Sequence, residues 1–394
     1  MFLYAQNNNR KQPPLQKEYN IKQAISERAQ LHTIAFNGLA FITGSFGADT
    51  FFPPGKVADY FGFQYMRDND KNEMGHNTDF LTRIANNVIR ILNDEQLQQL
   101  KDLANIQAST YEEFAQNRIV LIKAFRDELE GNIPSGKSEL SKEEVIKYCS
   151  KLYELDAELS YGRALVVGKI IYSLSESQKA GFAKLDFSNS STWQEFPEIL
   201  DKKNLSHRAH VCVMTYASEL FSWYAGSVNA DVYFCPERHG TYFGGFYLKD
   251  YSAMGNHGYN ISTSLTGDKG KDFIALLTDE QKDCLNQTVK NQEPLLEEIV
   301  QIRTAVSIEL RRAMKNINPD KDTVFALINR YGEIDGEMSY NYTCCFSNIY
   351  KTLTSEQKEK LKAIRDLNVV PDGGFIFSDS IDILKFDNAG FLFK

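Results

Sequence analysis

Two similar motifs place pairs of carboxylates at helical spacing along the chain. The stretch YELDAELSY begins at Tyr153, and YGEIDGEMSY begins at Tyr331. Residues four apart lie on one face of a helix, so each motif would present two glutamates and its last tyrosine together, while Asp156 points away. We expect the glutamates to border the core, with arginines of the preceding helix as partners. The predicted polar network comprises Arg118, Glu154, Glu158, Tyr161, Arg303, Glu333, Glu337 and Tyr340.

This network has two interpretations. Partly buried glutamate, arginine and tyrosine side chains can fix the register between helices. Paired carboxylates can also bind a metal ion or act as general acid and base. Neither motif contains the Glu-x-x-His that accompanies di-iron sites in helical bundles. We therefore favour the structural interpretation and keep metal-dependent chemistry as the alternative.

A second candidate metal site follows residue 230. Cys235 and His239 are four residues apart in CPERH, and His257 follows in MGNHG. Thiolate and imidazole ligands, together with the nearby carboxylate of Asp231, are typical of copper and zinc sites. Isolated histidines more often have structural roles, and the earlier part of the chain lacks counterparts of Cys235 and His239. Both interpretations stay open.

Segments rich in glycine and aromatic residues are the stronger candidates for ligand binding. GSFGADTFFPPGKVADYFGFQY begins at Gly44, and GSVNADVYFCPERHGTYFGGFY begins at Gly226. Long irregular loops are usually functional or disordered, and the many aromatic residues argue against disorder. Alternatively, the aromatic residues plug the end of a helical bundle and the aspartates cap backbone amides. The predicted ligand-binding residues are Asp49, Tyr60, Phe61, Tyr65, Asp231, Tyr242, Phe243 and Tyr247.

These segments belong to a larger repeat, in which residues 44–185 align with residues 226–365. The aromatic segments match at residue numbers that differ by 182 (226 − 44), the following helical region at 185, and the carboxylate motifs at 179. Small insertions and deletions between matching blocks are typical of an old tandem duplication. The matched pairs include Asp49 with Asp231, Tyr60 with Tyr242, Arg118 with Arg303, Arg126 with Arg311, and Glu154 with Glu333.

A short pattern, L-[TSN]-x-x-Q, occurs twice in each copy. Serine or threonine at the helix N-cap accepts a hydrogen bond from a first-turn amide, and glutamine three residues later bonds the amide of the cap. Asn93 keeps a good cap but departs from the strict capping box. The pattern therefore predicts four capped helices. The copies are ILNDEQ from Ile91, SLSESQ from Ser173, LLTDEQ from Leu276 and TLTSEQ from Thr352.

The spacing of apolar residues predicts an all-α protein of two homologous antiparallel bundles with long bent helices, related by a pseudo-two-fold axis. Pro294 should kink or break its helix, and Asn318 with Pro319 should begin the next one. Helices are expected at about 18–43, 94–131, 141–172, 206–225, 279–316 and 319–351. The expected domains are a disordered or signal-peptide remnant at 1–17, the first repeat at 18–185, a linker at 186–205, the second repeat at 206–370 and an extended tail at 371–394.

Composition and charge disfavour several classes of function. A chain of 394 residues at 42% hydrophobic content can bury the cores of two domains. A net charge of −8 without a dense basic cluster disfavours binding to nucleic acid or anionic membranes. The longest apolar runs fall short of the ~18–20 residues of a transmembrane helix. The stretch GNIPSGKS at 131–138 matches the Walker A spacing but links two expected helices, whereas a phosphate-binding loop follows a strand. The G-x-G-x-x-G, G-x-S-x-G and HExxH patterns are missing, so nucleotide-driven chemistry is not expected.

The first residues, MFLYAQNNNRKQ, resemble the end of a signal peptide, which predicts a periplasmic or secreted protein. A disordered cytoplasmic start is the alternative. The six cysteines have no C-x-x-C spacing, so they do not indicate a zinc ribbon or a thioredoxin-type motif. We expect the adjacent Cys344 and Cys345 to be small core residues rather than a redox couple.

Pairs of L-T-x-x-Q motifs about 80 residues apart, from Gln96 to Gln178 and from Gln281 to Gln357, resemble the Spy/CpxP family of periplasmic proteins. The resemblance covers about 90–185 and 275–365. It implies a bent-helix subunit that dimerises into a cradle, with one half of this chain per subunit. Members include ATP-independent chaperones, envelope-stress inhibitors and metal-responsive proteins. The chain departs from the family in its acidic charge and its aromatic segments.

Three functional hypotheses follow. The leading one is an exported, ATP-independent binding protein, chaperone-like and related to stress or metal, whose ligand surface lies between the two repeats. Its ligand would be a non-native polypeptide, a small apolar molecule or a metal, and assembly into a homo-oligomer stays open. The second is a metal-dependent enzyme whose pocket combines the aromatic loops with the paired glutamates. The third is a purely structural envelope or assembly protein.

Overall fold

The structure, a computed structural model, describes residues 22, 25–44, 60, 78–186, 189–197, 199–233, 252–253, 256–260, 269–365 and 389–394. Within this part of the chain the fold is all-α apart from one small hairpin, which confirms the predicted class. The α-helices are α2 (Glu27–Thr43), α4 (Thr78–Ile91), α5 (Asp94–Glu130), α6 (Lys142–Tyr172), α7 (Glu176–Phe182), α8 (His207–Ala225), α9 (Val228–Tyr233), α11 (Lys269–Leu276), α12 (Asp279–Leu310), α13 (Lys321–Thr352) and α14 (Ser355–Ile364). The hairpin pairs β1 (Ser252–Ala253) with β2 (Asn256–Asn260), and 3₁₀ turns lie at η3 (Ser190–Thr192), η4 (Lys202–Asn204), η5 (Arg311–Lys315) and η7 (Gly390–Leu392).

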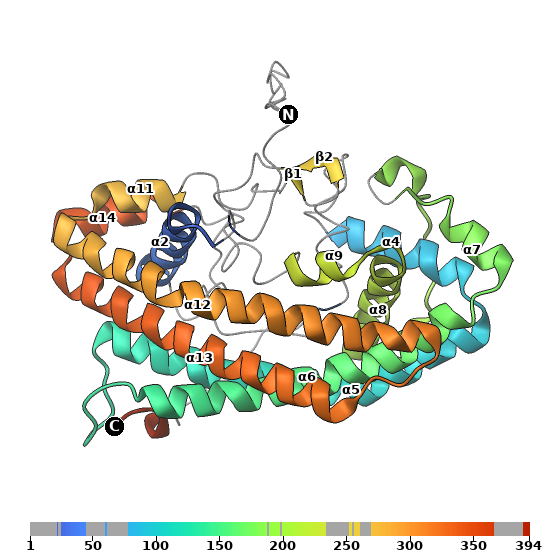
Figure 1. The fold of residues 1–394 in the computed structure, drawn as a ribbon, viewed down its shortest axis with the longest axis horizontal. Coiled ribbons are helices and arrows are strands. Elements are labelled where there is room, and N and C mark those ends of the chain that lie inside the picture. Colours follow the sequence, from blue (N-terminus) through green and yellow to red (C-terminus); the bar gives the residue numbers. More distant parts are fainter. Residues whose placement is uncertain are drawn as a thin grey trace, which may run out of the picture.

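Four long helices run along the length of the molecule (Figure 1). α12 packs on α13, α13 packs on α6, and α6 packs on α5, with the largest contact between α6 and α13. Two glycines of α13 allow this close approach. A Cβ atom at Gly332 would lie 2.7 Å from Cβ of Tyr153, and one at Gly336 would lie 2.8 Å from Cβ of Cys149. The two halves of the sequence are thus joined at the centre of one helical layer.

The first helix of each half packs on helices of the other half. α2 lies against α11 and α12 at one end of the molecule, and α8 lies against α4 and α5 at the other end (Figure 1). Tyr216 of α8 donates to Oε1 of Gln107 on α5 at 2.7 Å, and Gln292 of α12 donates to Oε1 of Gln30 on α2 at 2.6 Å. The two halves therefore interlock.

All four L-[TSN]-x-x-Q motifs begin helices with a complete capping box. The glutamines also pair within each half. Gln178 donates to Oε1 of Gln96 at 2.6 Å, and Gln357 donates to Oε1 of Gln281 at 3.0 Å. The same side chains donate to the carbonyls of Ile91 and Leu276, which occupy matching positions before the motif. The glutamine therefore caps its own helix and ties the two motifs of a half together.

Several local predictions were wrong. Asn93 forms the full capping box, because its side-chain oxygen accepts from the Gln96 amide at 2.9 Å as a serine hydroxyl would. α12 continues through Pro294, so the helix does not break there, and a kink at Pro294 stays a prediction. α13 begins two residues later than expected, with Asp320 as N-cap in place of Asn318. The segment after Gly226, predicted to be an irregular loop, contains α9 and the β1–β2 hairpin.

The end of the chain docks on the loop between α5 and α6. Leu140 and Phe393 form an isolated antiparallel bridge, and the Ser141 amide donates to the Leu392 carbonyl at 2.8 Å. Leu392 and Phe393 are buried there. Residues 389–394 of the predicted extended tail therefore pack on the helices, and they include the 3₁₀ turn η7.

Candidate functional site

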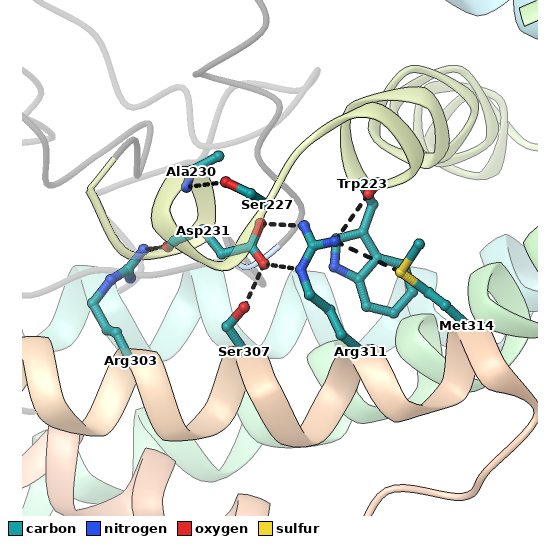
Figure 2. Close-up of polar contacts among 8 residues, drawn as sticks. All are labelled: Trp223, Ser227, Ala230, Asp231, Arg303, Ser307, Arg311 and Met314. Atoms are coloured by element: carbon teal, nitrogen blue, oxygen red, sulfur yellow. Dashed lines mark hydrogen bonds and ion pairs between the residues drawn. The ribbon is translucent and has the colours of Figure 1, made fainter. Parts of the chain in front are cut away.

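The most elaborate polar cluster surrounds Asp231, which lies on α9, the short helix that follows α8. Its side chain is fully buried. Arg311 donates two hydrogen bonds to the carboxylate, from Nε to Oδ2 at 2.6 Å and from Nη2 to Oδ1 at 3.0 Å, and the Ser307 hydroxyl donates to Oδ2 at 2.5 Å (Figure 2). Two charge-assisted bonds from one guanidinium fix the orientation of a carboxylate. Asp231 therefore anchors the start of the second aromatic segment to the end of α12.

Arg303, two turns before Arg311, holds the other side of α9. Its Nε donates to the Val232 carbonyl at 2.8 Å, and its Nη2 donates to the Asp231 carbonyl (Figure 2). The guanidinium also lies 5.2 Å from the ring centre of Tyr60, a residue of the first aromatic segment, and Tyr60 is fully buried. Both predicted segments thus meet at one arginine. We call Tyr60, Asp231, Arg303, Ser307 and Arg311 the Asp231 junction.

The end of α8 is fixed by Arg311 in a way that recurs in the first half. Arg311 donates to the Trp223 carbonyl at 3.1 Å and stacks 5.5 Å from the Trp223 ring centre. Arg126 donates to the Phe41 carbonyl at the end of α2 at 2.9 Å and lies 4.8 Å from the Phe41 ring centre. The two arginines match in the sequence repeat, and Phe41 and Trp223 each lie three residues before one of its copies. The same local geometry therefore occurs at both ends of the molecule.

At the Asp231 junction, the cost of burying the Asp231 carboxylate opposes the attraction of the neighbouring arginines. Burial raises the pKa of the Asp231 carboxyl above its ordinary value, although Arg311, Ser307 and Arg303 all act to lower it. Removing water from the carboxylate thus outweighs the attraction of two arginines. The junction holds charge at an energetic cost, and only a well-fixed geometry offsets that cost.

The structure locates two of the predicted ligand-binding residues and gives both an anchoring role. Asp231 binds side chains of α12 and η5, which differs from the alternative prediction that it caps local backbone amides. Tyr60 packs against Arg303 from a fully buried position. The other residues predicted for this surface, Asp49, Phe61, Tyr65, Tyr242, Phe243 and Tyr247, lie outside the described residues.

The predicted glutamate network is wrong in its orientation. Glu154 and Glu158 are exposed, and Glu333 and Glu337 are half-buried. Glu333 pairs with Arg330 at 2.8 Å and Glu337 with Lys142 at 2.7 Å, near the surface. The remaining members do not gather around these carboxylates. Arg303 lies at the Asp231 junction, and Arg118 is buried on α5. Tyr161 donates to the Pro319 carbonyl at 3.2 Å, and Tyr340 lies near Cys344, where burial raises the pKa of the Tyr340 hydroxyl.

The buried acids of these motifs are the aspartates between the glutamates. Asp156 and Asp335 are fully buried at matching positions of α6 and α13. Tyr153 donates to Oδ2 of Asp335 at 2.5 Å across the α6–α13 contact, and its ring lies 5.1 Å from that of Tyr331. One signal could have found them: small residues follow each aspartate at i+1 and i+4, which marks a face in close contact with another helix.

Sequence reasoning also missed a buried ion pair between α6 and α8. Arg163 and Glu219 form a salt bridge with both side chains almost inaccessible to water. Arg163 also donates to the Tyr111 hydroxyl at 3.1 Å and lies 4.8 Å from the ring centre of Tyr216. The repeat matches Arg163 with Tyr342, and Asn37 lies as far before the first copy as Glu219 lies before the second. The Arg163–Glu219 ion pair therefore has no counterpart at the matching positions, so comparing the two halves of the sequence could not reveal it.

The structure does not show the arrangement of the predicted copper or zinc ligands. Cys235 and His239 lie outside the described residues, and His257 belongs to β2 without a described side chain. Among the side chains that the structure describes, three or more histidine, cysteine or acidic residues do not gather at any point. Glu154 and Glu333 instead line a groove of about 650 Å³ between α6 and α13, together with the lysines at 142, 147 and 151.

Comparisons with known proteins give no match. No protein-family model matches the chain, and neither the curated proteins nor the solved structures include one that matches it. In the described part of the chain, the helices are too short or too polar to cross a membrane.

Proposed function

We propose that the protein binds its ligand without nucleotide, as an exported member of the Spy/CpxP type, at a surface between the two halves. One observation carries this proposal: Arg303 contacts Tyr60 of the first aromatic segment and the backbone of α9 at the start of the second. Segments more than 170 residues apart in sequence thus reach the same point of the fold. The repetition of a long aromatic segment in both halves is more typical of a binding surface than of helix packing alone.

The proposal includes a tandem duplication with a pseudo-two-fold arrangement. Its support is the recurrence of four contacts: the glutamine pairs, the reciprocal packing of α2 and α8, the bonds of Gln107 and Gln292 to those helices, and the stacking of Arg126 and Arg311 on Phe41 and Trp223 near the helix ends. Chance would not repeat contacts at matching sequence positions in this way. A fused pair of subunits would enclose one surface shared by both.

The ligand we favour is a segment of a non-native polypeptide. Aromatic side chains supply large contact areas for apolar groups at little cost in conformational entropy. The anchoring by Asp231 and Arg303 would hold these segments in place, so that binding need not order them first. Nothing in this arrangement requires ATP.

The test is suppression of client aggregation by the purified full-length chain. Reduced α-lactalbumin is the client, its aggregation is followed by light scattering, and nucleotide is omitted. We expect suppression at roughly stoichiometric ratios, strong loss with Tyr60→Ala, and retention with Tyr148→Ala. Tyr148 is the matched control because it is also a packed aromatic residue, stacked 5.3 Å from Phe391 and far from the junction in sequence and contacts.

Circular dichroism must show that both variants fold before the comparison is made. Equal suppression by both variants would remove the site from the Asp231 junction. Failure of the wild-type chain at every ratio would refute the chaperone-like activity. A stoichiometric transition metal in protein purified from its source, lost in Glu337→Gln or His239→Ala, would instead favour the metal-dependent enzyme.

A further inference from the structure

Two cysteines of the second half face each other between neighbouring helices. Cys284 lies two turns into α12, and Cys345 lies two turns before the end of α13. Two contacts on either side fix the antiparallel register of these helices: Gln281 donates to the Thr352 hydroxyl at 3.1 Å, and Arg330 donates to Glu298 at 2.7 Å. This register brings residue 284 opposite residue 345.

The two thiols interact, and their exposure differs. Cys284 is half-buried, whereas Cys345 is 2% exposed. A cavity of about 370 Å³ at the paired capping boxes is lined by Cys284 and by Ile349, which is one turn after Cys345. A small disulfide-containing molecule can therefore reach the sulfur of Cys284 before it reaches that of Cys345.

We propose that Cys284 and Cys345 are an oxidation site, at which a small disulfide such as oxidised glutathione converts the two thiols into an intramolecular disulfide that joins α12 to α13. This inference does not depend on the proposed binding function. The chain repeat matches these positions with Gln99 and Val166, so the site belongs to the second half alone.

The reaction has two exchange steps. The Cys284 thiolate attacks one sulfur of oxidised glutathione, forming a mixed disulfide and releasing one glutathione thiolate. The sulfur of Cys345 then attacks that of Cys284, releases the second glutathione and gives its proton to the departing thiolate. Two protein thiols are oxidised, and one glutathione disulfide is reduced to two thiols.

The order of attack follows from the surroundings of each sulfur. The hydrogen bond from Cys345 lowers the pKa of the Cys284 thiol, against the effect of burial. The same bond and burial raise the pKa of Cys345. Because the thiolate is the nucleophile, Cys284 reacts first. Once Cys284 is a mixed disulfide its negative charge is gone, which removes the main obstacle to ionisation of Cys345.

The adjacent Cys344 provides a matched control. It is half-buried and sits beside Tyr340, and burial raises the pKa of its thiol. The full-length chain and its Cys284→Ser, Cys345→Ala and Cys344→Ser variants are incubated with oxidised glutathione, quenched with acid and alkylated. Trypsin then gives one peptide with Cys284, residues 283–290, and one with the cysteine pair, residues 331–351.

Mass spectrometry of the digests decides the proposal. We expect a disulfide-linked pair of these peptides in the wild-type chain and in Cys344→Ser, a stable glutathione adduct on Cys284 in Cys345→Ala, and neither product in Cys284→Ser. Circular dichroism checks that each variant folds. A link that disappears in Cys344→Ser while surviving in Cys345→Ala would overturn the assignment, as would a wild-type chain that keeps both thiols free or stops at the mixed disulfide.

Discussion

Replacing Asp231 with alanine removes the carboxylate that ties α9 to α12. The substitution leaves the Arg311 guanidinium and the Ser307 hydroxyl without the acceptor that now receives three hydrogen bonds. Breaking a buried ion pair by removing one partner costs about 3–5 kcal/mol. Arg311 keeps its bond to the Trp223 carbonyl, and its side chain is 14% exposed, so water can reach it. We therefore expect the lower end, a loss of about 3 kcal/mol in the free energy of unfolding.

Asparagine at the same position should cost less. It keeps one acceptor oxygen for Arg311 or Ser307 and carries no charge. Because burial already outweighs the arginines and raises the pKa of the Asp231 carboxyl, the neutral side chain loses less than the count of hydrogen bonds implies. We expect the order wild type, then Asp231→Asn, then Asp231→Ala in stability.

The sign of the pH dependence follows from the same raised pKa. The folded state binds the Asp231 proton more tightly than the unfolded chain does. Lowering the pH from above the raised pKa of the folded state to below the ordinary pKa of 3.8 therefore stabilises the folded wild type at this site. Asp231→Asn cannot titrate there. The stability advantage of wild type over Asp231→Asn should therefore grow as the pH falls through this window.

Urea denaturation followed by far-UV circular dichroism measures these differences. With an m-value of about 3 kcal/mol per molar urea, a loss of about 3 kcal/mol lowers the midpoint by about 1 M. Glu298→Gln is the control, since it breaks a partly exposed pair with Arg330 and should cost about 0–1 kcal/mol. If Asp231→Ala were no more destabilising than Glu298→Gln at unchanged m-value, the anchoring role of Asp231 would be refuted.

Three further substitutions test the packing. Gly332→Ala should lower the free energy of unfolding by about 1–3 kcal/mol, because its Cβ would lie 2.7 Å from the nearest carbon of α6. Glu333→Ala on the next residue should lower it by under about 1 kcal/mol. Equal losses in urea denaturation would contradict the close approach of α6 and α13. Glu219→Ala should lower the free energy of unfolding by about 3–5 kcal/mol, because it leaves Arg163 buried without its acid. The double variant with Arg163→Met should be more stable than Glu219→Ala alone. A less stable double variant in thermal unfolding would argue against a costly buried charge. Thr354→Ala should lower stability by about 1 kcal/mol through loss of the α14 cap, and an unchanged midpoint would mean that the glutamine pair alone holds this end.

The sequence predicted helices well where local chemistry decides the outcome. α5 and α6 begin at the predicted caps, and α12 and α14 begin after the threonines of their capping boxes. These predictions succeed because a cap involves atoms within three residues of each other. The glutamine pairs were not foreseen, since they join residues 76 and 82 positions apart.

The orientation of the carboxylate motifs could not be obtained from apolar spacing. α6 contacts α5 on one side and α13 on the other, so most of its circumference is covered and a single apolar stripe does not identify the buried face. Asp156 is therefore buried although it lies opposite the predicted face. The choice of aspartate also fits the close helix contact, because its side chain is one methylene shorter than that of glutamate.

The sequence also could not predict that α2 packs on helices of the second half and α8 on helices of the first half. α2 and α8 each precede one copy of the repeat, and their apolar spacing does not distinguish packing within one half from packing across the two halves. Only the path of the connecting segments selects between these arrangements. The contact of Gln292 with Gln30, rather than with a residue of α8, shows which one the chain adopts.

Hydrogen–deuterium exchange of the full-length chain, with and without unfolded α-lactalbumin, tests the ligand surface most directly. We predict that the client slows exchange in peptides that contain Tyr60 and in those covering α9, and leaves exchange unchanged in the Lys142–Glu154 part of α6 that lines the surface groove. Protection confined to that groove, or absent from both aromatic segments under conditions where the client is bound, would contradict the placement of the binding surface at the Asp231 junction.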